Sequence, residues 1–480
     1  MEFDLSNREF YWFNEICKIP HPSRYEKGVS DFVKKFAEEH GLQYKQDDMY
    51  NIIVYKPASP GCEKAAPLIL QGHMDMVPAV EKGYSHDFTK EPLDLYVDEE
   101  GWLHARHTTL GADDGIGPAQ MLAILEDDTL KIPPLECLFT VGEELGLDGA
   151  RNLKPEDIGA DRLITLDCMD EACADLCSAG GCTSIGEYAL QMEENTAPCY
   201  ELKIADLVGG HSGADIHLER GNAIRITARI LEEAMLNDCE VKLVSIAGGE
   251  ADNAIPVRCE TVFVSGTDKE KLYASFEKTK AEILDELRES EPHAVITLEE
   301  TGIKDKAAVN TAGLVEYMYL IPNGFRHRSM EIEGLTYTSL NLGTVRMEGD
   351  TVIMEDLLRS MYISAMDDMN RHLALIAKKT GVVYKQGVTY SGWKFKEVSP
   401  LREHFKVACA VHGDELRMKA EHGGLEAGIF CGLRPGLDIV TVGADCTGYH
   451  TPKEKLNLAS FHKCYQIVRT LVELCAEDIE

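Results

Sequence analysis

The chain has 480 residues and a formal net charge of −34, and these two values limit its architecture and its partners. This length exceeds what one hydrophobic core supports, so we expect two or more domains. Hydrophobic residues make up 44% and charged residues 27%, a balance typical of soluble globular proteins. The acidic excess argues against nucleic acids and anionic membranes as partners, because surfaces that bind phosphates need an excess of Lys and Arg.

The start of the chain, MEFDLSNREF, is acidic and mixed and does not resemble a secretory signal. We also find no apolar run long enough to cross a membrane. We therefore expect a cytoplasmic protein whose fifteen cysteines are reduced and mostly buried. The densest group of cysteines, in 168–182, lacks the C-x-x-C spacing of a zinc ribbon.

The two ends of the chain alternate helix and strand patterns. Helical patterns cover 6–20, 25–40 and 116–125. Short, nearly continuous apolar runs predict buried strands at 51–55, 68–70, 135–141, 162–166 and 438–442. Buried strands that alternate with helices indicate an α/β layer with a mixed, mostly parallel sheet and helices on both faces.

The middle of the chain has a different pattern. Residues 199–299 predict the order strand, helix, strand, strand, helix, strand, which is an α+β, ferredoxin-like layer. From about 308 a second series of elements echoes this order, which is compatible with a duplication. We therefore predict one domain that is split into 1–186 and 394–480, with an inserted α+β domain at 187–393.

A possible metal ligand ends the second predicted strand, in the segment GHMDMVP. His73 and Asp75 are two residues apart at a strand end, so they point to the same side. Imidazole is a common metal ligand, and a nearby carboxylate can hold its other nitrogen. We predict that His73 binds a metal ion and that Asp75 lies behind it and sets its tautomer.

Further carboxylates and a second histidine follow the other predicted strands or open a helix. In an open α/β sheet, such positions gather in the crevice at the carboxyl ends of the strands. The candidates are Asp113 and Asp114 in TTLGADDGIG, Glu143 and Glu144 in VGEELGLDGA, Asp167 in ITLD, and His450 in GYHTP.

Two histidines with several carboxylates suit a pair of divalent ions. Zinc is preferred, with manganese or cobalt as alternatives. Two ions bridged by one carboxylate can activate a shared water or hydroxide. The predicted ligands are Asp113 as the bridge, His73 and Asp167 for one ion, and Glu144 and His450 for the other. Glu143 is then placed to act as general base and afterwards as acid.

In their order along the chain, these five motifs resemble those of the co-catalytic zinc metallopeptidases. That group includes carboxypeptidase G-type enzymes, aminoacylases and bacterial dipeptidases. The stretches GGHSGADIHLERGNA and HGGLEAGIF make the dipeptidases the most similar branch, and the resemblance covers nearly the whole chain. It implies hydrolysis of unblocked dipeptides, Xaa-His among them, with the same ligands and base. One departure is ADDG where ADNG is frequent, which leaves Asp114 as an alternative bridge.

The resemblance also implies functions for residues outside the ligand set. His211 matches a histidine that reaches over the active site and stabilises the oxyanion. Asn253 matches an asparagine that contacts one end of the substrate. Arg328 or Arg326 would bind the substrate carboxylate through paired hydrogen bonds.

Gly424 and Glu426 lie in a loop that resembles the loop lining the substrate pocket. The inserted domain would close as a lid over a small substrate. Members of the family commonly dimerise through this domain, so we expect a homodimer. His211 would then act either in its own chain or across the dimer.

Two other hypotheses remain beside a dipeptidase. An N-acyl amino-acid deacylase would use the same metal site, but the long insert favours the dipeptidase. A binding protein on a retired peptidase scaffold would have lost a ligand or the base, and all seven expected positions are filled.

Overall fold

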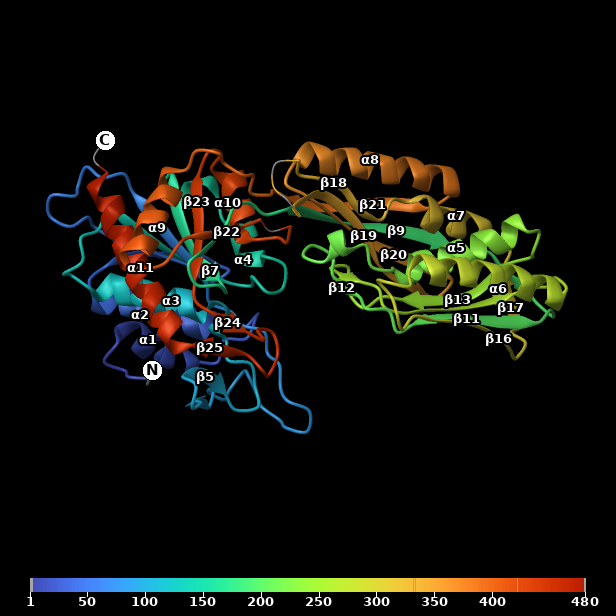
Figure 1. Cartoon of the computed structure of the whole chain (residues 1–480), viewed down its shortest axis with the longest axis horizontal. Helices are drawn as coiled ribbons and strands as arrows, with labels where there is room; N and C mark the ends of the chain where they lie inside the picture. Colours follow the sequence, from blue (N-terminus) through green and yellow to red (C-terminus); the bar gives the residue numbers. More distant parts are fainter. Residues whose placement is uncertain (1–2, 331, 333, 421, 479–480) are drawn as a thin grey trace. The chain divides into compact units, whose positions relative to one another are not determined.

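The structure is a computed structural model that describes residues 3–330, 332, 334–420 and 422–478, and it divides into two compact units (Figure 1). Unit 1 comprises Met1–Leu176, Phe395–Ala420 and Leu425–Glu480, and unit 2 comprises Cys177–Lys394 and Glu421–Gly424. We expected the insert to begin at residue 187. Unit 2 begins earlier because β9 (Gly180–Ala189), which spans that boundary, pairs with two strands of its sheet. The short segment 421–424, expected in the second part of the split domain, also belongs to unit 2.

Unit 1 is built on a six-stranded mixed sheet in the order β1-β2-β6-β3-β7-β23. The four strands from β6 to β23 are parallel, and β1 and β2 extend them antiparallel. All six residues of β3 are buried, which explains its unbroken apolar run. The bounds are β1 (Gln43–Gln46), β2 (Ile52–Lys56), β3 (Leu68–His73), β6 (Leu135–Thr140), β7 (Arg162–Cys168) and β23 (Asp438–Gly443).

Helices cover both faces of this sheet, as the sequence predicted. One face packs against five helices around a single hydrophobic core, and the other lies against the shorter α4 and α10. No helix within the described residues is long and apolar enough to cross a membrane. The helices of the first face are α1 (Arg8–Cys17), α2 (Lys27–Glu39), α3 (Ala112–Glu126), α9 (Pro400–Val411) and α11 (Leu458–Glu477); those of the second are α4 (Asp148–Asn152) and α10 (Glu426–Leu433).

Two smaller ladders complete unit 1. A four-stranded sheet in the order β24-β25-β5-β4 lies beside the loop that carries His450, and β22 pairs in parallel with β8. A single 3-10 turn, Pro155–Asp157, precedes β7. The strands are β4 (Leu95–Val97), β5 (Trp102–Ala105), β8 (Cys173–Asp175), β22 (Arg417–Lys419), β24 (Cys446–Thr447) and β25 (Lys455–Asn457).

Unit 2 is built on one long antiparallel sheet in the order β16-β11-β15-β13-β19-β20-β9-β21, with β18 added beside β19. Its first half contains β11 (Cys199–Ala205), α5 (Ala223–Leu236), β13 (Lys242–Gly248), β15 (Cys259–Val264), α6 (Lys269–Glu286) and β16 (Val295–Thr301). Its second half contains β9, α7 (Thr311–Leu320), β18 (Gly324–Arg328), β19 (Thr336–Glu348), β20 (Thr351–Ser360), α8 (Ile363–Thr380) and β21 (Val383–Tyr390). Short strands β10 (Met192–Glu194), β12 (Gly210–His211), β14 (Ala254–Ile255) and β17 (Lys306–Ala308) form two further ladders, and a 3-10 turn covers Ile216–Leu218.

The two halves of this sheet repeat one topology. If the four strands of each half are numbered along the chain, without β18, both halves place them in the order 4-1-3-2, and β13 joins β19 at the centre. The first strand of the second half is β9, which precedes the whole first half in the chain. That separation is why the sequence showed only part of the second repeat, from about residue 308 onward.

Candidate active site

The candidate ligands of unit 1 lie at one edge of its sheet. His73 is the last residue of β3, Asp167 is the penultimate residue of β7, and Glu143 and Glu144 occupy the turn that follows β6. Because β6, β3 and β7 are parallel neighbours, their carboxyl ends meet at the same edge. The sequence prediction that these side chains gather is therefore matched by the backbone.

Asp113 lies between the two histidines. Its Oδ1 is 3.2 Å from Nε2 of His73, and its Oδ2 is 3.2 Å from Nε2 of His450. The same nitrogen of His450 is 2.9 Å from Oε1 of Glu144. A carboxylate that turns one oxygen toward each imidazole has the arrangement of a bridging ligand.

The side chains fit divalent metal ions. Three sets of ligand atoms each lie within 4.8 Å of one another: His73 with Asp114 and Asp167, His73 with Glu143 and Glu144, and Asp113 with Glu144 and His450. Imidazole and carboxylate donors without thiolates suit zinc, manganese and similar ions. The described residues thus contain a donor set large enough for more than one ion.

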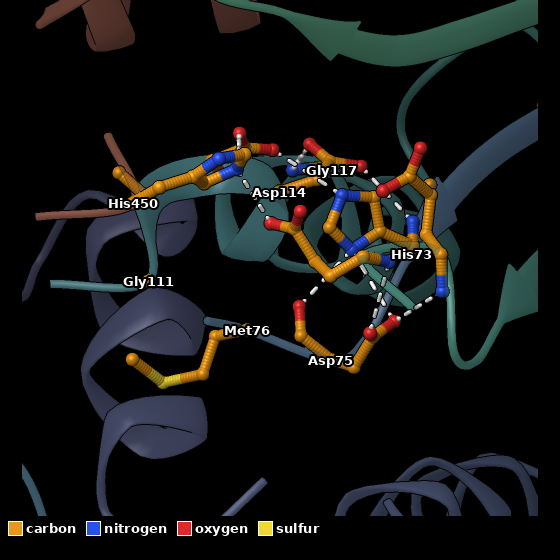
Figure 2. A network of polar contacts seen from close by, with 12 residues as sticks. His73, Asp75, Met76, Gly111, Asp114, Gly117 and His450 are labelled. Carbon is orange, nitrogen blue, oxygen red and sulfur yellow. Dashed lines mark hydrogen bonds and ion pairs between the residues drawn. The ribbon is translucent and has the colours of Figure 1, made fainter. Parts of the chain in front are cut away.

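Asp114 is held differently from Asp113. Its Oδ2 accepts the backbone N–H of His73 and its Oδ1 accepts that of Gly117, both at 3.1 Å (Figure 2). A Cβ added at Gly72 or Gly117 would lie 2.5 to 2.6 Å from this carboxylate, so the glycines make room for it. Asp114 therefore fastens the turn to the end of β3, while the oxygens of Asp113 face the imidazoles.

Asp75 supports two neighbours of the site at once. The Nδ1 of His73 donates to the backbone carbonyl of Asp75 at 3.0 Å, which leaves Nε2 free to bind a metal. The carboxylate of Asp75 accepts the N–H groups of Glu143 and Glu144 at 3.0 and 3.3 Å, and the hydroxyl of Ser23 at 2.8 Å. The sequence prediction missed Ser23, because only the fold brings it to Asp75.

The crowded carboxylates and imidazoles change the protonation of one another. Burial raises the pKa of Glu143 well above its usual range, and it raises that of Asp167 to about 7, with neighbouring carboxylates adding to both shifts. The contacts of His450 with Asp113 and Glu144 raise its pKa to about 10. Binding of divalent cations would displace these protons, so metal affinity should rise with pH.

Glu426, expected near the substrate pocket, is a buried carboxylate close to the candidate ligands. It begins α10, is 3% exposed, and its Oε2 accepts hydrogen bonds from Gln71 at 2.6 Å and Thr140 at 2.8 Å. Burial raises its pKa to about 8. Its side chain is therefore buried beside β3 and β6, within electrostatic range of His73 and Asp167.

Unit 2 contains a second polar cluster, around His211 of β12. The Nδ1 of His211 accepts the N–H of Ala214 at 3.1 Å. The guanidinium of Arg359, on β20 and 4% exposed, lies 3.3 Å from Nε2 of His211 and 3.4 Å from the hydroxyl of Ser212. A buried guanidinium beside an imidazole favours an anionic partner.

The other residues expected to contact substrate also lie in unit 2. Asn253 is exposed, and its carbonyl accepts the N–H of Ser212 at 2.8 Å, next to His211. A Cβ added at Gly424 would lie 2.6 Å from the hydroxyl of Tyr390, so a larger residue there would displace the Tyr390 side chain. Arg326 and Arg328 are exposed on β18. The arginine that lies against His211 is thus Arg359, which the sequence analysis did not single out.

Comparisons with known proteins agree with this architecture. The profile of peptidase family M20/M25/M40 matches residues 69–474. The cytosol non-specific dipeptidase of Escherichia coli (strain K12) is 34% identical over 471 residues, covering 96% of each chain. The crystal structure of aminoacylhistidine dipeptidase from Vibrio alginolyticus is 31% identical, with a TM-score of 0.86 and 98% of each chain covered. Aminopeptidase PepT from Bacillus cereus, at 17% identity and a TM-score of 0.58 over 99% of this chain and 100% of its own, shares the fold. The chain therefore belongs to peptidase family M20/M25/M40 and is a hydrolase that acts on peptide bonds.

Proposed function

We propose that the protein is a dipeptidase with two divalent metal ions, zinc preferred and manganese or cobalt as alternatives. The observation that carries this proposal is the position of Asp113, with one carboxylate oxygen 3.2 Å from each imidazole. Two relatives similar over nearly their whole length bear the name dipeptidase, which supports the substrate class. The proposed ligands are Asp113 as the bridge, His73 and Asp167 for one ion, and Glu144 and His450 for the other.

The ions, when bound, supply an activated water and polarise the carbonyl of the scissile bond. Glu143 takes a proton from the attacking water as the water oxygen bonds to the carbonyl carbon. When the carbon–nitrogen bond breaks, Glu143 returns that proton to the leaving amine. Asp75 holds the backbone of Glu143 in place for both transfers.

The cluster around His211 supplies the proposed contacts to the substrate. The imidazole of His211 is proposed to stabilise the oxyanion. Arg359, in place of Arg328, is proposed to bind the free carboxylate of the dipeptide, because its buried guanidinium is fixed beside His211. Asn253 would contact the same end of the substrate. The insert is proposed to act as a lid, with His211 working in its own chain or across a dimer.

Assembly and location follow as further proposals. We propose a homodimer formed through the insert, whose sheet ends, among the residues that the structure describes, in the edge strands β16 and β21. Light scattering coupled to size exclusion tests this, since a monomer would contradict it. No cysteine of the described residues forms a disulfide, and the Escherichia coli relative is named for the cytosol, which together support a cytoplasmic location.

A substrate panel tests the proposed activity. Metal-free protein reloaded with zinc, manganese or cobalt should hydrolyse Xaa-His and other unblocked dipeptides. N-acetylated amino acids serve as the comparison, because a deacylase would use the same metal site on an acyl group. Turnover of acetylated amino acids at rates above those of every dipeptide would replace the dipeptidase assignment with the deacylase.

A further inference from the structure

The turn that carries Asp113 is held by a buried carboxylate from a distant part of the chain. Oε2 of Glu454 accepts the backbone N–H groups of Leu110 at 2.7 Å and Gly111 at 3.0 Å. Its Oε1 accepts those of Ala112 at 2.8 Å and Asp113 at 3.3 Å. Glu454 is only 2% exposed. One side chain thus fixes four consecutive backbone groups.

The local geometry explains why a carboxylate fits here. The turn opens α3, where the first N–H groups of a helix have no partner within the helix and where negative charge is favoured. Gly111 has φ +70, and a Cβ there would approach the sulfur of Met76 to 3.0 Å. Figure 2 shows Gly111 and Met76 close together beside the network of His73 and His450. Glycine therefore allows the turn to present its N–H groups to both oxygens of Glu454.

Glu454 also belongs to the loop that carries His450. It follows His450 by four positions and directly precedes β25, which pairs with both β24 and β5. Residues 448–453 between β24 and β25 are mostly exposed, and His450 itself has φ +62. Glu454 is therefore the buried end of an otherwise exposed loop. It connects this loop to the turn that bears Asp113.

We propose that Glu454 is a positioning residue that holds Asp113 and His450 at a fixed separation, so that both can bind one ion together with Glu144. This inference rests on the proposed two-ion function. Without the carboxylate, the turn and the loop are free to move apart, and an ion would have to order both on binding. The positions of His73 and Asp167 depend less on Glu454, because the paired strands β3 and β7 hold them.

The test compares metal binding in wild type and in Glu454→Gln, which keeps the size but loses the charge and one acceptor oxygen. Metal-free protein is titrated with Zn²⁺ against a competing chromophoric chelator. We expect wild type to bind two ions, and the variant to bind one of them roughly 10- to 100-fold less tightly; the other, which shares Asp113 but keeps His73 and Asp167, should weaken by a smaller factor. Asp438→Asn is the matched control. Asp438, the first residue of β23, is a buried carboxylate that accepts the backbone N–H of Leu401 at 3.1 Å. In Asp438→Asn, both zinc affinities should therefore stay at the wild-type values.

Three results would overturn the inference. If Glu454→Gln binds both ions with wild-type affinity, Glu454 is not a positioning residue, and the proposed two-ion function is unaffected. A variant that loses both ions equally points to general damage, especially if Asp438→Asn does the same. Wild type that fails to bind two ions overturns the proposed function and this inference together. Should Glu454→Gln fail to fold by circular dichroism, Glu454→Asp keeps the charge on a shorter side chain, and unchanged affinities in it would equally contradict the proposal.

Discussion

The carboxylate of Asp75 accepts the backbone N–H of Glu143 at 3.0 Å. The residue that was expected only to orient His73 thus also holds the turn that presents the proposed general base. The backbone carbonyl of Asp75 accepts a hydrogen bond from Nδ1 of His73 at 3.0 Å, whereas the Asp75 carboxylate is 3.5 Å from that nitrogen. Asp75 therefore fixes His73 through its backbone carbonyl and Glu143 through its carboxylate.

Asp75→Ala should lower kcat by about 100-fold or more, because the base is worth roughly 10²- to 10⁴-fold and loses its support. The Ser23→Ala variant removes one donor to the same carboxylate and leaves its bonds to Glu143 and Glu144, so it should cost less than about tenfold. Steady-state kinetics on an unblocked dipeptide measure both. An Asp75→Ala enzyme as active as Ser23→Ala would contradict this support.

Glu143→Gln should lose about 10²- to 10⁴-fold in kcat while it keeps its metal content, because the amide cannot accept the proton. Glu144→Gln is the matched variant at the adjacent position, and it should instead lose metal, since Glu144 contacts His450 at 2.9 Å. Kinetics and elemental analysis of both proteins decide the assignment. Loss of metal from the Glu143 variant, with retention in the Glu144 variant, would exchange the two roles.

Arg359→Ala should raise KM for dipeptides by roughly 10- to 100-fold, the value of a charged hydrogen-bonded contact of about 1.5–3 kcal/mol. Arg328→Ala serves as the control on exposed β18, and its KM should stay close to that of wild type. Initial rates over a range of dipeptide concentrations separate KM from kcat. If Arg328→Ala raises KM and Arg359→Ala does not, the carboxylate-binding site belongs to β18.

We predict that the raised pKa of Glu426 makes the free energy of unfolding fall as the pH rises. Burial raises its pKa from 4.5 to about 8, so the folded state holds a proton that the unfolded state releases between these values. The stabilisation is complete below about pH 4.5 and is lost as the pH rises through 8. Glu426→Gln cannot titrate, so the difference in urea midpoint between the variant and metal-free wild type should grow in the variant's favour from pH 5 to 9. A difference that does not change with pH would show that Glu426 is ionised in the folded protein.

The edge of the sheet that carries the candidate ligands could be predicted, because short stretches of sequence show where each strand ends. His73 and Asp167 each end a buried apolar run, and parallel strands bring such ends together. The choice between Asp113 and Asp114 needed the turn itself. Asp114 is captured by backbone N–H groups of His73 and Gly117, which leaves Asp113 to face the histidines. Because Asp113 and Asp114 have the same side chain, the sequence alone does not show which of them faces the histidines.

Residues whose surroundings come from distant segments were not predicted. Arg359 sits in a strand whose side chains are nearly all buried, and His211, the group that marks its role, lies on β12, more than a hundred positions earlier. A lone arginine in a buried strand was the signal that could have found it. Glu426 is two positions from Gly424 in the sequence, but it begins a helix that turns its side chain inward.

The most direct test of the account is the zinc content of wild type beside that of Asp113→Ala and Asp114→Ala, each reloaded and then dialysed against metal-free buffer. We expect two ions per chain in wild type and fewer than one in Asp113→Ala, because both ions share that carboxylate. Asp114→Ala should retain more metal than Asp113→Ala, since its carboxylate holds the turn. Wild type with a single ion, or Asp113→Ala with two, would contradict a dinuclear site bridged by Asp113.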